Sequence, residues 1–148
     1  MKGSEKMTVF VVDSSSGDRW RISGFLEGNG FTVKSFLTGT VMMSQLTDHP
    51  ALIVLNHDVG EETTGLQFLR RIRAVSSSTP VLFMCNTDDT ATAVSALRQG
   101  AFYYIEKDAL LMENMVTALA DLDLEGKRKF RRFLQSFRRS IYSFYNVL

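Results

Sequence analysis

Four polar side chains stand at the ends of short apolar runs, and their chemistry is the first information in this sequence. Asp13, Asn56 and Cys85 each end one of these runs, and Lys107 follows a fourth. A carboxylate oxygen can attack phosphorus, whereas a neutral carboxamide oxygen is a far poorer nucleophile. A thiol is most often a small buried apolar group, although beside a lysine it can become acidic and reactive. If the four residues meet, Asp13 and Lys107 can neutralise each other directly.

The apolar runs alternate with segments of helical period, which predicts a parallel sheet flanked by helices. The expected strands are residues 7–12, 31–36, 51–55, 81–85 and 102–105. The first three expected helices are residues 18–27, 41–46 and 65–75. A fourth helix begins after a cap at Asp88 or Asp89 and ends at Gln99. A fifth begins after a cap at Asp108 and has apolar residues every three or four positions, at Met112, Met115, Leu119 and Leu122.

This order predicts an α/β fold, a (βα)5 doubly wound parallel sheet of five strands in the order 2-1-3-4-5, the topology of flavodoxins. The functional crevice of such a sheet lies beyond the carboxyl ends of its strands, where the four polar residues should meet. The first helix is expected to bury Trp20, Ile22, Phe25 and Leu26 on one face.

Length and composition fit one soluble globular domain. The chain has 148 residues, of which 45% are hydrophobic and 22% charged, and its apolar runs are far shorter than the ~20 residues of a membrane helix. The N-terminus has no apolar core of a secretory signal, and a single cysteine excludes an intramolecular disulfide framework. We therefore expect a cytoplasmic protein.

The net charge of +1 hides an asymmetry between the body and the C-terminal segment. Residues 1–126 contain ten basic and sixteen acidic residues, a net charge of −6, whereas residues 127–148 carry seven basic residues and no acid. An acidic body with a basic tail indicates either mutual docking or an anionic partner for the tail. The basic residues are Lys127, Arg128, Lys129, Arg131, Arg132, Arg138 and Arg139.

The same segment has a heptad pattern, which predicts an amphipathic helix over residues 125–148, separate from a domain over residues 1–124. Its apolar positions are Phe130, Leu134, Phe137, Ile141, Phe144 and Leu148. We expect this apolar stripe either to pack on residues 1–124 of the same chain or to pair with a second copy. Binding of nucleic acid or an anionic membrane is a weaker alternative, and a helix that leads to an output domain is another.

Several segments resemble the response regulator receiver domain, over roughly residues 7 to 123. They are Val11-Val12-Asp13, the helix at 65–73, Thr79-Pro80-Val81 and, most clearly, residues 100–107. The resemblance implies a role in two-component phosphorelay signalling. In that family, two adjacent acids after the first strand and an acceptor aspartate after the third hold Mg²⁺, while a hydroxyl residue and a lysine bind the phosphoryl oxygens.

Carried over by position, the resemblance is incomplete and implies a degenerate phosphorylation pocket. Asp13 stands at the first acidic position, but Ser14 stands at the second. Asn56 replaces the acceptor, Cys85 replaces the hydroxyl residue, and Lys107 is retained. With one carboxylate against one lysine, we expect no cofactor, a lost or very weak Mg²⁺ site and no catalytic residue.

Further positions leave alternatives open. Tyr104 stands at the position of the aromatic that changes rotamer on activation, and Asp108 follows the lysine where the family usually has proline. The loop after Asn56 is one residue longer than usual, which makes Asp58 an alternative acceptor. The run Ser14 to Gly17 can cradle a phosphate, as in flavodoxins, although Asp18 would compete with an anion there.

The sequence therefore predicts an atypical receiver-like module that acts by phosphorylation-independent protein contact, through the region from the fourth strand to the fifth helix and through the C-terminal helix. We expect a homodimer with a protein partner from a signalling pathway and no small-molecule substrate. The alternatives are a phosphoacceptor that uses Asp58 and a binder of nucleic acid or membrane surfaces.

Overall fold

The computed structural model describes residues 7–86 and 88–124. Five short parallel strands form one sheet in the order β2-β1-β3-β4-β5, as the alternating pattern predicts. The strands are β1 (Thr8–Val12), β2 (Thr32–Phe36), β3 (Leu52–Asn56), β4 (Val81–Cys85) and β5 (Tyr103–Glu106). The helices are α1 (Ser16–Gly28), α2 (Gly39–Ser44), α3 (Gly65–Val75), α4 (Thr90–Arg98) and α5 (Leu111–Leu124), with a 3₁₀ turn at Leu46–Asp48.

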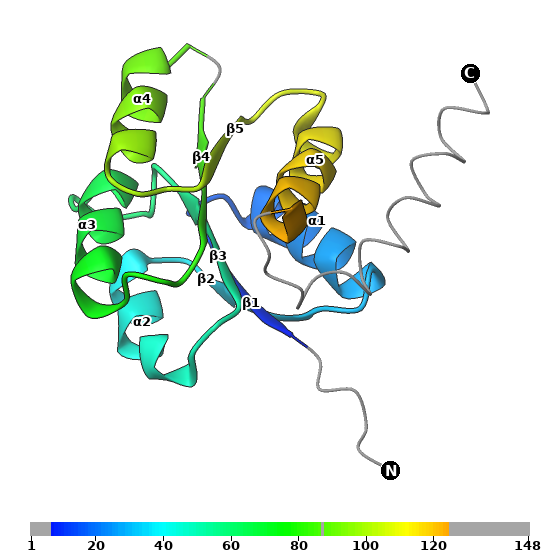
Figure 1. The fold of residues 1–148 in the computed structure, drawn as a ribbon, viewed down its shortest axis with the longest axis horizontal. Helices are drawn as coiled ribbons and strands as arrows, with labels where there is room; N and C mark the ends of the chain where they lie inside the picture. The colour runs from blue at the N-terminus through cyan, green and yellow to red at the C-terminus, as the bar shows by residue number, and fades with distance from the viewer. Residues whose placement is uncertain (1–6, 87, 125–148) are drawn as a thin grey trace.

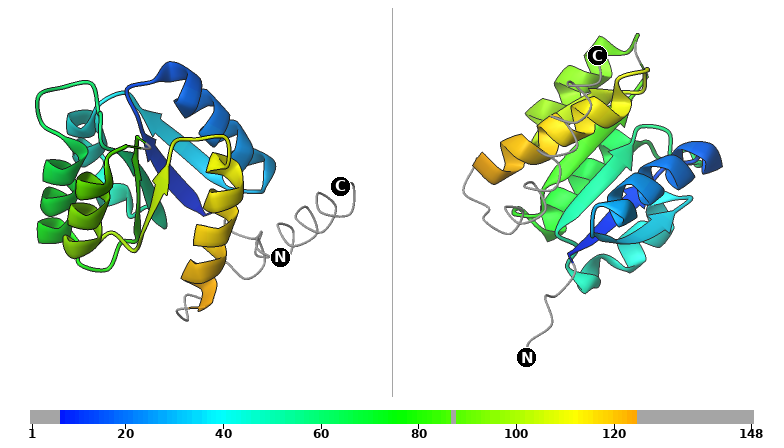
Figure 2. Two further views of the ribbon diagram at one scale, coloured as in Figure 1. Left: turned by 90° about the horizontal axis from the view of Figure 1, so that it is seen from above. Right: turned by 90° about the vertical axis from the view of Figure 1, so that its right-hand side faces the viewer.

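The helices cover the two faces of the sheet in separate layers. Helices α1 and α5 lie side by side on one face, and α2, α3 and α4 cover the other (Figures 1 and 2). Each layer encloses its own apolar cluster, one containing Ile22 and Leu119 and the other containing Phe68 and Ala96. The fully buried strands β3 and β4 have apolar side chains on both faces because both faces are covered.

Helix α3 starts close to the end of β3, and a glycine makes this approach possible. The Gly65 amide donates to the His57 carbonyl over 2.8 Å. A Cβ at Gly65 would collide with the backbone oxygen of Asn56, so a larger residue would push the helix away from the strand end. Thr64 and Gln67 close the helix start with a reciprocal capping box.

Some element bounds and the position of Trp20 differ from the sequence prediction. The helix expected at 41–46 lies two residues earlier, at Gly39–Ser44, and the 3₁₀ turn follows it, while β3 and β5 each run one residue later than expected. Trp20 was expected in the core, but its side chain is 80% exposed. At ~100° per residue, Trp20 lies roughly 160° around the helix from the buried Ile22.

Within the described residues, no helix is both long enough and apolar enough to cross a membrane. The predicted C-terminal helix at 125–148, with its apolar stripe and its basic residues, lies outside the described residues.

Candidate functional site

The carboxyl ends of the central strands bring the predicted polar residues to one edge of the sheet. The register pairs Asn56 with Met84 and Cys85 with Glu106, so the ends of β3, β4 and β5 are level. Asp13 follows β1 and is fully buried, and Asn56 is 5% exposed. Arg19 of α1 supports the loop after β1 by donating to the Asp13 and Ser14 carbonyls over 2.7 and 3.2 Å.

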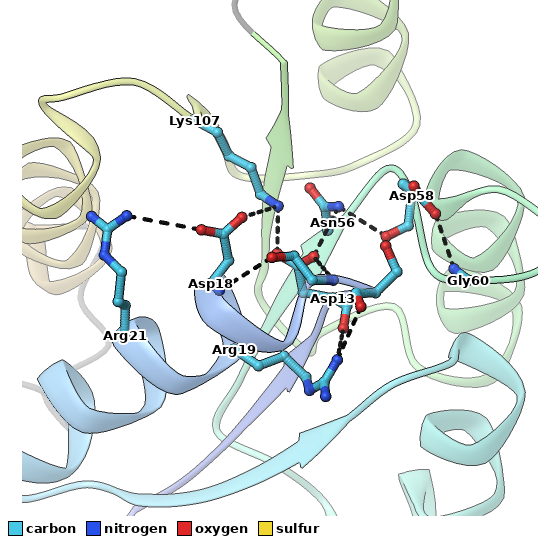
Figure 3. A network of polar contacts seen from close by, with 10 residues as sticks. Asp13, Asp18, Arg19, Arg21, Asn56, Asp58, Gly60 and Lys107 are labelled. Carbon is cyan, nitrogen blue, oxygen red and sulfur yellow. Dashed lines mark hydrogen bonds and ion pairs between the residues drawn. The ribbon is translucent and has the colours of Figure 1, made fainter.

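The side chain of Asn56 acts as a hydrogen-bond donor. Its Nδ2 lies 3.2 Å from Asp13 Oδ1 and 2.8 Å from the Asp58 carbonyl oxygen (Figure 3). Both partners are acceptors, and a carboxylate at position 56 has no hydrogen to give either of them. The surroundings of position 56 are therefore matched to a carboxamide.

The Lys107 ammonium lies between two carboxylates. Its Nζ is 2.6 Å from Asp13 Oδ2 and 2.9 Å from Asp18 Oδ2 (Figure 3). The expected contact between Asp13 and Lys107 is present, and Asp18 is an unexpected third member of the group. Asp18 lies in the first turn of α1, three residues after the capping Ser15, and this turn faces the same sheet edge. Lys107 thus connects the start of α1 to the loop after β5.

The pKa values of Asp13 and Asp18 shift in opposite directions. Burial raises the pKa of Asp13, although Lys107 and the Ser15 amide partly oppose this change. Burial also acts to raise the pKa of Asp18, but Lys107, Ser15 and Arg21 outweigh it and lower this pKa below its ordinary value. The less buried Asp18 therefore stays ionised to lower pH than Asp13 and keeps a negative charge beside Lys107.

A family model described as "Response regulator receiver domain" matches residues 9–120. The chain belongs to the response regulator receiver domain family. Members of this family are signalling modules that work through contact with partner proteins.

The similar proteins are mostly longer than this receiver chain. It is 33% identical over 99 residues to the DNA-binding transcriptional regulator NtrC of Salmonella typhimurium, covering 67% of this chain and 21% of NtrC. It is 31% identical to the C4-dicarboxylate transport transcriptional regulatory protein DctD of Rhizobium meliloti, covering 68% of this chain and 22% of DctD. The solved receiver domain of NtrX from Brucella abortus superimposes with a TM-score of 0.70 at 25% identity, covering 86% of this chain and 98% of that domain.

Asp58, the alternative acceptor, is not directed at the ion pair. Its side chain is exposed, and its Oδ1 accepts a hydrogen bond from the Gly60 amide over 3.0 Å, on the side away from Asp13 (Figure 3). Its backbone carbonyl accepts from the Ser14 amide over 3.3 Å and from Asn56. In this receiver, Asp58 thus contributes its main chain to the pocket.

Cys85 behaves as a buried apolar residue. It is 2% exposed and packs in the cluster under α2, α3 and α4. Burial raises the pKa of its thiol, and the charges of Asp89 and Glu106 raise it further. Burial and these two acidic neighbours act against the alternative of an acidified thiol beside Lys107. The Lys107 amide donates to the Cys85 carbonyl over 2.9 Å, while the Lys107 ammonium pairs with Asp13 and Asp18.

Tyr104 lies on a different face of the receiver domain, between α4 and α5. It is half-buried on β5 and packs against the apolar cluster beneath α4. A shallow hollow opens here, and its lining residues are Leu97, Tyr103, Tyr104, Ile105, Glu106, Asp108 and Asn114. We call this surface the α4–β5 hollow.

Proposed function

We propose that this receiver domain transmits signals by phosphorylation-independent contact with a protein partner in a two-component-type pathway of the cytoplasm. The observation that carries the proposal is the side chain of Asn56, which donates to Asp13 and to the Asp58 carbonyl at the end of β3. A pocket that uses this residue as a donor lacks the nucleophile of phosphoryl transfer. The domain is then an interaction module and not an enzyme.

The donor set of the pocket does not suit Mg²⁺, the metal that the family implies. Asp13 Oδ1 accepts from the Ser15 amide and from Asn56, and Asp13 Oδ2 is paired with Lys107. A divalent cation would have to displace the ammonium from between Asp13 and Asp18, and the neighbouring Asn56 and Ser14 would add only a carboxamide and a hydroxyl. Among the described residues, no group of three or more acidic, histidine or cysteine side chains is placed to hold a metal.

The proposed contact surface is the α4–β5 hollow, with a second copy of the chain as its occupant. Leu97 on α4 is 43% exposed, and Val94 one turn earlier is 42% exposed. Half-buried Tyr103 and Tyr104 extend this apolar surface, and Glu106 and Asp108 add negative charge at its border. Aromatic and leucine side chains with a charged rim are typical of protein interfaces.

Phosphorylation can be tested directly by incubating the full chain with acetyl phosphate and Mg²⁺ and measuring the intact mass. We expect no gain of a phosphoryl group, because position 56 has no carboxylate to attack phosphorus. An Asp58→Asn variant is treated in parallel. A hydroxylamine-labile gain in the natural chain that disappears in D58N would reject the proposal and identify Asp58 as the acceptor.

The interface can be tested by comparing two exposed leucines. We expect Leu97→Asp to weaken dimerisation roughly tenfold or more, since a central apolar contact is lost and a charge is desolvated. Leu37 is 54% exposed and does not line the α4–β5 hollow, so Leu37→Asp should leave the dimer unchanged. Light scattering across a dilution series measures both. Equal behaviour of the two variants would exclude this surface as the dimer interface.

A further inference from the structure

An exposed tryptophan marks an apolar surface on the layer formed by α1 and α5. Trp20 is 80% exposed, the highest value among the exposed large hydrophobic residues of the described chain. It borders an open hollow, the α1–α5 hollow, lined by Trp20, Arg21, Gly24, Phe25 and Met112. Its lining residues come from α1 and α5, which lie on the opposite side of the sheet from α2, α3 and α4 (Figure 2).

The floor of the α1–α5 hollow is apolar and has room for side chains from another element. Phe25 and Met112 are partly buried and pack against the apolar cluster beneath α1 and α5. Gly24 is exposed, and a Cβ built on it would meet no atom within 4 Å. Arg21 lies 3.9 Å from Asp18, so its positive charge has an acidic neighbour. The hollow therefore has the shape and polarity to receive apolar groups from an amphipathic helix.

The C-terminal segment starts at the right place to reach this hollow. Helix α5 ends at Leu124, so only Glu125 and Gly126 separate it from the basic amphipathic sequence. Going back from Leu124 to Met112 covers about 18 Å, since a helix rises ~1.5 Å per residue. A helix over residues 127–148 would be roughly 33 Å long by the same measure, enough to run back along α5 past Trp20.

Charge also favours docking on the same chain. The described residues carry eight basic and fourteen acidic side chains, a net charge of −6. On the two helices, Glu27, Glu113 and Asp121 supply negative charge. The segment 127–148 has no acid and has seven basic residues, all within 127–139, so this first part of the segment is attracted to the body.

We propose that residues 127–148 fold back on their own chain and dock their apolar stripe in the α1–α5 hollow, covering Trp20. A connection of two residues holds the segment at an effective concentration of about millimolar or above, which favours the same chain over a second copy. The docked helix would leave the α4–β5 hollow open. This inference does not depend on whether the pocket at Asp13 accepts a phosphoryl group.

Trp20 is the only tryptophan of the chain, so its fluorescence reports the docking directly. In the full chain we expect a blue-shifted emission maximum and weak quenching by acrylamide. Replacing Phe137 of the stripe, Phe137→Ser, should shift the emission to the red and at least double the quenching constant. Tyr142 lies off the stripe, so Tyr142→Ser should change neither value and serves as the matched control.

Each remaining outcome decides against the inference. Emission typical of a fully exposed indole in the natural chain, with no response to F137S, would show that the segment does not cover Trp20. A red shift of the natural chain on hundredfold dilution would assign the contact to a second copy. Circular dichroism and urea unfolding distinguish undocking of the C-terminal segment from unfolding of the domain. Undocking leaves the cooperative unfolding transition of the domain in place, whereas an unfolded variant has no such transition.

Discussion

Replacing Lys107 with methionine is expected to destabilise the domain by roughly 3–5 kcal/mol at neutral pH, the usual cost of leaving a buried charge without its partner. Asp13 is fully buried, and the Lys107 ammonium 2.6 Å away is the cation that pairs with it. Methionine keeps the length and apolar stem of lysine, so packing changes little and the charge is the main loss. Urea unfolding of the variant and the natural chain measures the difference.

The pH dependence of this effect has a definite sign. Burial raises the pKa of Asp13 above its unfolded value. The contribution of Asp13 to stability is therefore fully present below the unfolded pKa and is lost as pH rises through the folded pKa. Without Lys107 this pKa rises further and the fall becomes larger. Asp18 acts in the same direction. Its pKa is lowered in the folded state, so its ionised form stabilises the fold above the unfolded pKa, and this stabilisation depends on Lys107. The variant should therefore match the natural chain near pH 3 and fall behind it toward pH 7.

Lys34 provides a matched control for this experiment. It forms an ion pair of 2.7 Å with Asp48, but both side chains are 45% exposed. Lys34→Met should therefore change the free energy of unfolding by ~1 kcal/mol or less, as exposed pairs usually do. Equal losses in the two variants would mean that burial of Asp13 does not set the strength of the Lys107 pair.

The fold was predictable from the sequence because each signal for it is local. Apolar runs of strand length alternate with helical segments, and the right-handed crossover rule reduces the strand orders to a few, of which 2-1-3-4-5 is a common one for five strands. The meeting of Asp13, Asn56 and Lys107 follows from that order, since parallel strands place their carboxyl ends at one edge. No structure is needed for this step.

Asp18 and Trp20 were misjudged for a common reason. Both lie in the first turns of α1, where the direction of a side chain depends on how the helix is rotated on the sheet. Asp18 was interpreted only as a carboxylate at the helix start that would compete with a bound anion, yet it reaches Lys107 over 2.9 Å. Trp20 was counted as core because it is large and apolar, although Ile22 and Leu26 already define a different buried face. A stricter count of angles around the helix would have separated Trp20 from this face.

Asn56→Asp is the second large expected effect, and it tests the matching of the pocket to a carboxamide. The substitution puts a second carboxylate against Asp13 in a site where Asn56 is 5% exposed, and it removes the hydrogen bond to the Asp58 carbonyl. We expect a loss of about 3 kcal/mol at neutral pH without metal, from repulsion and from buried acceptors left without donors. The loss should diminish as pH falls and the new carboxyl becomes protonated.

Added Mg²⁺ makes this prediction specific to the pocket. Two adjacent carboxylates restore oxygen ligands, so Mg²⁺ at ten times its dissociation constant should return about 1.4 kcal/mol to the variant by binding only the folded state. The natural chain should not respond. Asn86 is exposed at the rim of the same pocket, so Asn86→Asp should change stability by ~0.5 kcal/mol or less. If N56D is as stable as the natural chain without Mg²⁺, the Asn56 carboxamide is not what holds this pocket together. The proposal of a receiver adapted to work without phosphorylation would then lose its main support.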